Sequence, residues 1–241
     1  MFNSILSMGI FFKMEFLFFC FILFLFLVCI FYKKYWNNID FTNIIIIHAM
    51  LIILGFCIHI LFLIFKIKNE SFLIIYYSSD FFSLYCKLFI LILTFFYLML
   101  CLNYFKHAKY AIVEFPILIL FSTLGMFFII GSNDFFVLFL GLEIQSLIFY
   151  ILAGLKRYSN LSIEASLKYF IFGSYASCIM LLGISFLYFS FGTLNFLEIN
   201  KLLIDSLSLS SINNNNSFFL VGIILFISAL FFKIAVFPFH V

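Results

Sequence analysis

The chain has 241 residues, of which 67% are hydrophobic and 10% are charged, and its formal net charge is +3. Soluble globular domains typically carry about 25% charged residues, so this composition excludes a soluble globule and indicates an integral membrane protein. The small net charge is spread along the polar joints of the chain. No basic patch therefore favours a nucleic-acid partner.

Seven apolar stretches are long enough to cross a bilayer, which takes about 20 residues of helix. They cover residues 14–32, 44–65, 81–105, 111–130, 135–155, 161–191 and 218–241. Because every backbone polar group in lipid must find a partner within the protein, we expect helices rather than open strands. The predicted fold class is an all-α polytopic membrane protein, with residues 1–241 forming a single transmembrane helical domain.

The joints between the spans are short and polar, except for a longer one over residues 192–217. That joint contains the amphipathic stretch NFLEINKLLI, which predicts a helix on the surface. Lys33, Lys34, Lys106, Lys109, Lys156 and Arg157 lie in the joints after odd-numbered spans, against Lys13, Lys66, Lys68 and Lys201 on the other side. This distribution predicts an N-terminus outside and odd-numbered joints on the cytoplasmic or matrix side.

Glu143 lies in the fifth span, about 12 Å along a helix counted from Phe135 and well inside the hydrocarbon. Charged side chains at this depth are rare and typically mark ion or proton pathways, although a polar contact between helices is the structural alternative. Ser146 lies three residues on, on the same helix face. Glu143 is therefore the first candidate site residue.

Lys233 follows a long uncharged stretch of the seventh span, and Pro238 comes five residues later. Proline interrupts a helix, and helices broken at membrane depth characteristically build ion sites. Lys168 in the sixth span has Glu164 four residues before it, so a local ion pair is a serious alternative to a functional role. Lys87 lies about 10 Å from the entrance of the third helix at Asp80. At this depth a lysine that snorkels to the membrane surface is as plausible as one with a functional role.

His48 and His59 share one face of the second span, eleven residues apart. Haem ligation would require facing histidines on another helix, and the sequence offers none, so hydrogen-bonded contacts between helices are the favoured interpretation. The six cysteines lie in apolar segments without a ligand spacing, so we expect no metal site.

Three motifs together resemble one family: GLE at 141–143, EASLKYFIFGS at 164–174 and FKIAVFPFH at 232–240, with DFFSLYCKLFILIL at 80–93 as a weaker match. The sequence resembles the first half of NADH dehydrogenase subunit 2, an antiporter-like membrane subunit of respiratory complex I. The resemblance implies the first repeat of the antiporter-like fold, with a broken seventh helix.

The same resemblance implies a proton relay of Glu143, Lys233 and Lys168, with Glu143 and Lys233 forming an ion pair. Lys87, Pro238 and His240 would be possible accessory residues. Family members carry a second, inverted repeat that this sequence lacks. We therefore expect a split subunit, in which a separate chain supplies the remaining helices; a truncated chain is the alternative.

The function expected from this resemblance is that of a membrane-arm subunit of the proton-pumping NADH:ubiquinone oxidoreductase, contributing half of a proton channel. The sequence has no nucleotide loop, iron-sulfur spacing or haem pattern, so NADH, flavin, iron-sulfur clusters and quinone would bind elsewhere in the complex. Partners would be other membrane subunits and lipids. The alternatives are a subunit of a multi-subunit cation/proton antiporter and a structural membrane subunit without a proton path.

The 42 phenylalanines, with many Ile and Asn, are typical of coding by an AT-rich organellar genome. Together with the resemblance, this bias predicts the mitochondrial inner membrane, with the N-terminus on the intermembrane side and the C-terminus on the matrix side.

Overall fold

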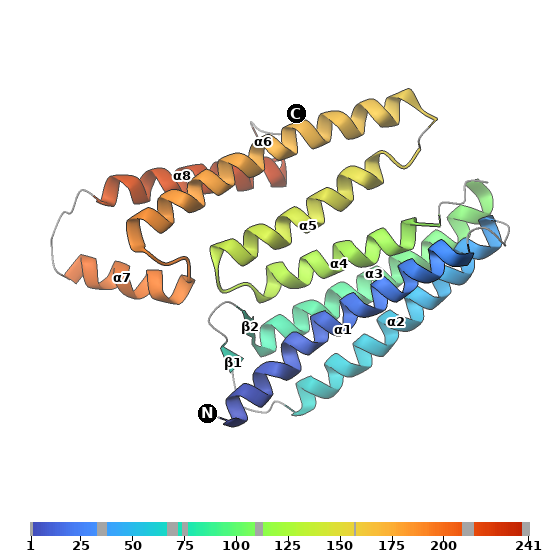
Figure 1. Cartoon of the computed structure of the whole chain (residues 1–241), viewed down its shortest axis with the longest axis horizontal. Coiled ribbons are helices and arrows are strands. Elements are labelled where there is room, and N and C mark those ends of the chain that lie inside the picture. The colour runs from blue at the N-terminus through green and yellow to red at the C-terminus, as the bar shows by residue number, and fades with distance from the viewer. Residues whose placement is uncertain are drawn as a thin grey trace. The chain divides into compact units, whose positions relative to one another are not determined.

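The computed structural model describes residues 2–32, 38–66, 72–73, 77–108, 113–156, 158–208 and 215–237. Within these ranges the chain is almost wholly helical (Figure 1). The helices are α1 (Phe2–Tyr32), α2 (Asn38–Lys66), α3 (Phe81–Ala108), α4 (Phe115–Gly131), α5 (Phe135–Ala153), α6 (Asn160–Phe191), α7 (Phe196–Ser208) and α8 (Asn215–Ile234). Two short strands, β1 (Phe72–Leu73) and β2 (Ser78–Ser79), pair antiparallel with Phe72 opposite Ser79.

Six of the described helices, α1 to α3, α5, α6 and α8, are long and apolar enough to cross a membrane. The predicted span at 111–130 corresponds to α4, which is apolar but has only 17 residues. A helix of that length is about 25 Å long, close to the shortest that spans a bilayer. The prediction of an all-α polytopic membrane protein is confirmed.

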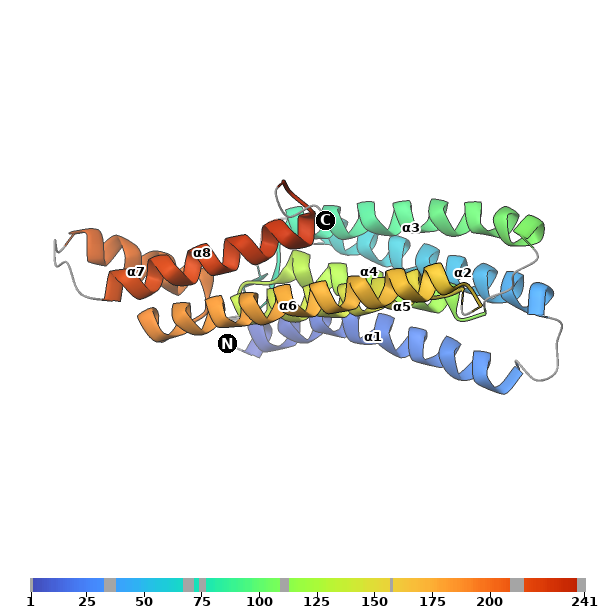
Figure 2. The ribbon, with the colours of Figure 1, turned by 90° about the horizontal axis from the view of Figure 1, so that it is seen from above.

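The chain divides into two compact units, residues 1–74 with 78–131 and residues 75–77 with 132–241. The division into compact units does not test whether residues 1–241 form a single transmembrane domain, so that assignment stays a prediction. In the first unit, α1, α2 and α3 run alongside one another in two perpendicular views (Figures 1 and 2). The ring of Phe18 on α1 lies at the centre of its core, 4.8 Å from Phe56 of α2 and 5.4 Å from Phe127 of α4 between ring centroids.

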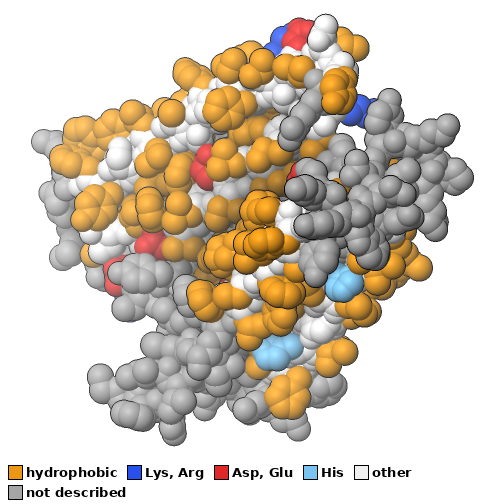
Figure 3. All heavy atoms as spheres, turned by 45° about the vertical axis from the view of Figure 1, so that its right-hand side comes forward, with side chains coloured by type: hydrophobic (Ala, Val, Ile, Leu, Met, Phe, Trp, Pro, Cys, Tyr) orange, Lys and Arg blue, Asp and Glu red, His pale blue; other side chains and the backbone are white. Residues whose placement is uncertain are grey.

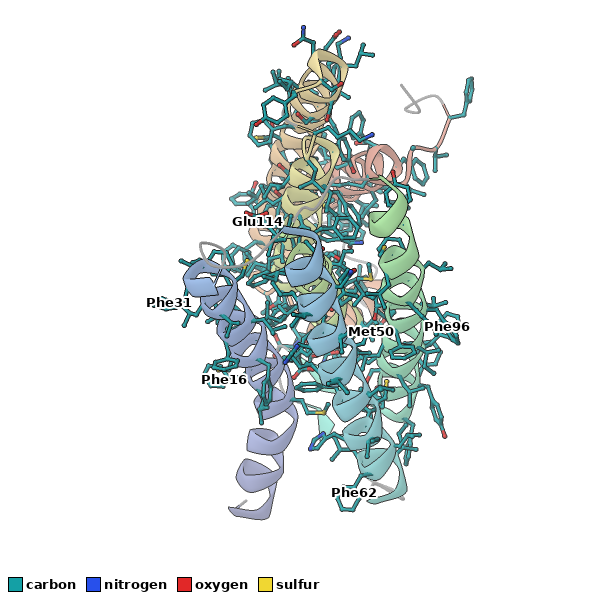
Figure 4. The ribbon with its side chains drawn as sticks, turned by 90° about the vertical axis from the view of Figure 1, so that its right-hand side faces the viewer. Phe16, Phe31, Met50, Phe62, Phe96 and Glu114 are labelled. Carbon is teal, nitrogen blue, oxygen red and sulfur yellow. The ribbon has the colours of Figure 1, made fainter. Side chains whose placement is uncertain are left out.

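The outer faces of the first unit are covered with exposed aromatic side chains (Figure 4). Phe16 and Phe31 on α1, Phe62 on α2 and Phe96 on α3 all point away from the helix bundle. A soluble protein rarely exposes so much contiguous apolar surface. These faces are suited to contact lipid or other transmembrane helices.

In the second unit, α6 and α8 cross at two glycines. A Cβ added at Gly183 would lie 2.8 Å from the backbone nitrogen of Phe226 and 2.9 Å from the carbonyl oxygen of Gly222. Without a hydrophobic driving force in lipid, helix association depends on such close backbone approach, which small residues permit. This crossing holds α8, and with it Lys233, against α6.

The connection before α7 is tied to the start of α5. Phe135 donates its N–H to the carbonyl of Leu194 at 3.2 Å, and Phe196 donates to Asn133 at 3.0 Å. The carboxylate of Asp134 caps α5 by accepting the N–H of Phe136 at 2.8 Å, as N-cap residues do. The amphipathic helix predicted from the sequence is present as α7.

The end of α8 is closed by a Schellman motif, in which the chain turns through a left-handed residue. Ala235 occupies that position with φ 57°. Its N–H donates to Phe232 at 3.1 Å, and the N–H of Val236 donates to Phe231 at 3.0 Å. The helix therefore stops immediately after Lys233 and Ile234, which fits the prediction of a broken seventh transmembrane helix.

Candidate functional site

Glu143 and Lys233 meet between α5 and α8, ninety residues apart in the sequence. The Lys233 ammonium donates to the Glu143 carboxylate at 2.8 Å and to the Ser146 hydroxyl at 3.2 Å. The side chains are only 12% and 24% exposed, respectively. The predicted ion pair is present in the structure.

Ser146 takes part in this site through the Lys233 ammonium and the backbone of Glu143. Its hydroxyl donates to the backbone carbonyl of Glu143 at 3.1 Å and accepts from Lys233, so it does not bond the carboxylate. Ser146 therefore gives the lysine a second, uncharged acceptor beside Glu143. A lysine with two adjacent acceptors can lose one of them without being left wholly unsatisfied.

The position of Lys233 in the last turn of α8 is electrostatically favourable. The carbonyl groups at a helix C-terminus carry partial negative charge, which stabilises a nearby cation by roughly 0.3 to 1 kcal/mol. The left-handed turn at Ala235 then carries the chain away from the helix axis. The ammonium is thus held by three features of different kinds: a carboxylate, a hydroxyl and a helix end.

Lys168 pairs with Glu164, four residues before it on α6, and not with Glu143. Its ammonium lies 2.5 Å from the Glu164 carboxylate, and the two side chains are 65% and 59% exposed. The structure thus favours the local ion pair that the sequence offered as an alternative. A part for Lys168 in the relay stays a proposal.

Lys87 forms a second buried ion pair, with Glu15 of α1. The two charged atoms lie 2.8 Å apart, and the side chains are only 4% and 5% exposed. The structure therefore favours a buried ion pair over the snorkelling lysine that the sequence offered as an alternative. Sequence reasoning did not single out Glu15, although it lies just inside the first predicted span and is followed by a long uncharged run.

The remaining candidates are histidines and Pro238. His48 pairs its ring nitrogen Nδ1 with the carbonyl of Ile44 on its own helix at 2.8 Å. Pro238 and His240 lie outside the described residues. Among the residues that the structure describes, no three His, Cys, Asp or Glu side chains form a group able to hold a metal ion.

Known proteins are similar to this chain in sequence and in fold. Residues 132–241 match the family model for the transmembrane part of NADH:quinone oxidoreductase and Mrp antiporters. The chain is 40% identical over 164 residues to NADH-quinone oxidoreductase subunit N 1 of Thermodesulfovibrio yellowstonii, covering 68% of this chain and 34% of that protein. It is 38% identical over 161 residues to NADH-ubiquinone oxidoreductase chain 2 of Marchantia polymorpha, covering 67% and 33%.

A third relative, NADH-quinone oxidoreductase subunit N of Bartonella bacilliformis, is 37% identical over 203 residues, covering 80% of this chain and 39% of that protein. The aligned parts thus span between a third and two fifths of these relatives, which confirms the resemblance to part of NADH dehydrogenase subunit 2. Among solved structures, a chain of respiratory complex I from Thermus thermophilus matches with a TM-score of 0.68 at 21% identity, over 94% of this chain and 45% of that one. A chain of the archaeal membrane-bound sulfane sulfur reductase has the same TM-score at 22% identity, covering 94% and 46%.

Proposed function

We propose that this chain, which matches the NADH:quinone oxidoreductase/Mrp antiporter family model over residues 132–241, is a membrane-arm subunit of a proton-pumping NADH:quinone oxidoreductase. It would work as half of an antiporter-like proton channel, with a separate chain supplying the other half. The observation that carries the proposal is the ion pair of Glu143 and Lys233 at the end of a broken helix.

This pair has the properties that proton exchange requires. Closed, at 2.8 Å, it neutralises two charges that are both largely withdrawn from the surface. When it opens, each buried charge costs several kcal/mol unless the group neutralises by gaining or losing a proton. A change of charge at a neighbouring site would therefore open or close the pair and drive a proton onward, with Lys168 as the proposed next group.

The same proposal covers partners, cofactors and location. The oxidoreductase label belongs to the assembly, in which NADH, flavin, iron-sulfur clusters and quinone would bind to other subunits. The partners would be further membrane subunits and lipids. The composition bias of the chain supports the mitochondrial inner membrane, and the distribution of Lys and Arg in its joints supports an N-terminus on the intermembrane side and a C-terminus on the matrix side.

The test is the proton yield per electron in sealed membrane vesicles that carry the assembled complex. Glu143→Gln and Lys233→Met are expected to lower this yield, while Glu198→Gln, an exposed carboxylate of α7 in the same unit, leaves it unchanged. Native electrophoresis and NADH oxidation with an artificial acceptor confirm that each variant assembles. A full proton yield in both site variants would show that the pair is not part of the proton path.

One alternative function follows from the description of the family, which also includes Mrp antiporters. A subunit of a cation/proton antiporter would move protons in exchange for sodium ions without NADH. Sodium-dependent proton flux that needs Glu143 and persists when NADH oxidation is blocked would replace the oxidoreductase assignment with this one.

A further inference from the structure

An apolar groove of about 630 Å³ lies between α1 and α2, within the first unit of the chain. Leu17, Phe21 and Phe24 of α1 line one side. His48 and His59 of α2 line the other, so the groove carries two imidazoles among otherwise apolar side chains. Figure 3 shows histidine side chains on such a largely hydrophobic face.

Both histidines lie at the depth of the hydrocarbon. The apolar part of α2 covers Thr42–Ile64, centred near Ile53. His48 and His59 are therefore about 7.5 and 9 Å from that centre, on opposite sides of it, against a half-thickness of about 15 Å. The headgroup of a single lipid cannot reach both positions, and acyl chains offer no hydrogen bond.

The two imidazoles have hydrogen-bonding capacity that faces the groove. His48 uses Nδ1 for the carbonyl of Ile44, which leaves Nε2 for another partner. His59 has an exposed side chain, and no described residue forms a hydrogen bond with it. A polar group left unsatisfied away from water costs about 1 to 3 kcal/mol, so a partner that satisfies both rings is strongly favoured over lipid.

Gly55 lies between the two histidines on the same helix face, at the i+7 position from one and four residues before the other. A Cβ added there would meet nothing within 4 Å, so the groove is open at this point. Small residues allow the backbone of another helix to approach closely in lipid. The pattern of a glycine flanked by two hydrogen-bonding groups is thus suited to a packed transmembrane helix.

We propose that this groove binds a transmembrane helix of another subunit, which presents two hydrogen-bonding side chains about eleven residues apart to His48 and His59. Over the roughly 16.5 Å between the histidines, 630 Å³ gives a cross-section of about 38 Å². That is between a third and a half of the cross-section of a helix 10–12 Å wide. The groove therefore receives one face of the partner helix, while its other side meets lipid or further helices.

The test is photo-crosslinking in membranes where the chain is assembled with its partners. A benzophenone amino acid replaces Leu51, an exposed residue of the groove, and in a control replaces Phe96, an exposed residue of α3 (Figure 4). The Leu51 probe is expected to form adducts with a single transmembrane segment of one partner. Adducts with lipid alone, or with the same set of neighbours as the Phe96 control, would overturn the proposal.

Matched variants separate docking from folding. His48→Leu with His59→Leu is expected to weaken the association about eightfold, or about 2.8-fold for each hydrogen bond, and to reduce the adducts accordingly. His48→Gln with His59→Gln, which keeps hydrogen-bonding groups, retains most of the adducts. Gly55→Trp fills open space within the chain and so blocks docking without disturbing its own packing. Unchanged crosslinking in the double Leu variant and in Gly55→Trp would refute the proposal, and no readout depends on proton pumping.

Discussion

Breaking the buried pair of Glu15 and Lys87 is expected to destabilise the first unit severely. Glu15→Leu leaves the Lys87 ammonium without its carboxylate in a site where both side chains are about 95% withdrawn from the surface. Removing one partner of a buried ion pair costs about 3 to 5 kcal/mol, because the remaining charge stays buried without its counter-charge. Glu15→Gln keeps an oxygen that can accept from the lysine, so its cost should lie near 3 kcal/mol.

The decisive measurement is the double variant Glu15→Leu/Lys87→Met, compared with both single variants by unfolding titration in detergent micelles. Without either charge, the site becomes apolar, and such replacements are often neutral or stabilising by about 1 to 4 kcal/mol. Glu164→Gln is the matched control, because its ion pair with Lys168 is exposed and its loss should leave the unfolding free energy unchanged. The reasoning fails if the single variants cost less than about 1 kcal/mol, or if the double variant costs as much as the two singles together.

Three further predictions concern the second unit. Gly183→Ala forces α6 and α8 apart, because its Cβ would lie 2.8 Å from the backbone nitrogen of Phe226. We expect the free energy of unfolding to fall by about 1 to 3 kcal/mol, which would lower the thermal unfolding midpoint. An unchanged midpoint would contradict the close crossing of the two helices. Ala235→Gly relieves the left-handed backbone at φ 57° and should stabilise the chain by about 0.5 to 1 kcal/mol in the same assay, whereas a destabilised variant would argue against the Schellman turn. Lys168→Met should reduce the proton yield per electron less than Lys233→Met does, since Lys168 is exposed and paired with Glu164; an equal loss would place both lysines in one obligatory path.

The membrane fold could be predicted from hydropathy because lipid leaves few alternatives. Each apolar run of about 20 residues must be a helix, since nothing else satisfies its backbone. The sequence also marked Glu143 and Lys233, because charges in long uncharged runs are rare and costly. Their pairing was expected only through the family resemblance, since spacing along a sequence does not show which helices touch.

The contacts that sequence reasoning missed depend on how the helices pack. Glu15 lies close to the predicted entrance of its span, where a carboxylate looks solvated, but α1 begins at Phe2 and so places it in the helix interior. Gly183 and Gly222 are uncharged and belong to no recognisable sequence motif, although the close approach of their backbones positions α8 against α6. Hydropathy reports how apolar a helix is, but not which of its faces meets a neighbour.

The two ion pairs differ in their burial and in their position along the helices. Glu15 and Lys87 both lie within uninterrupted helices, at 4–5% exposure, so opening their pair would leave both charges buried. Lys233 instead lies one residue before the end of α8, beside the left-handed turn at Ala235, and its pair with Glu143 is less deeply buried. Ser146 remains within reach at 3.2 Å when the carboxylate is lost. The proton exchange proposed for the pair between α5 and α8 is therefore expected to need less rearrangement than opening the pair between α1 and α3, which is suited to fixing helices in place.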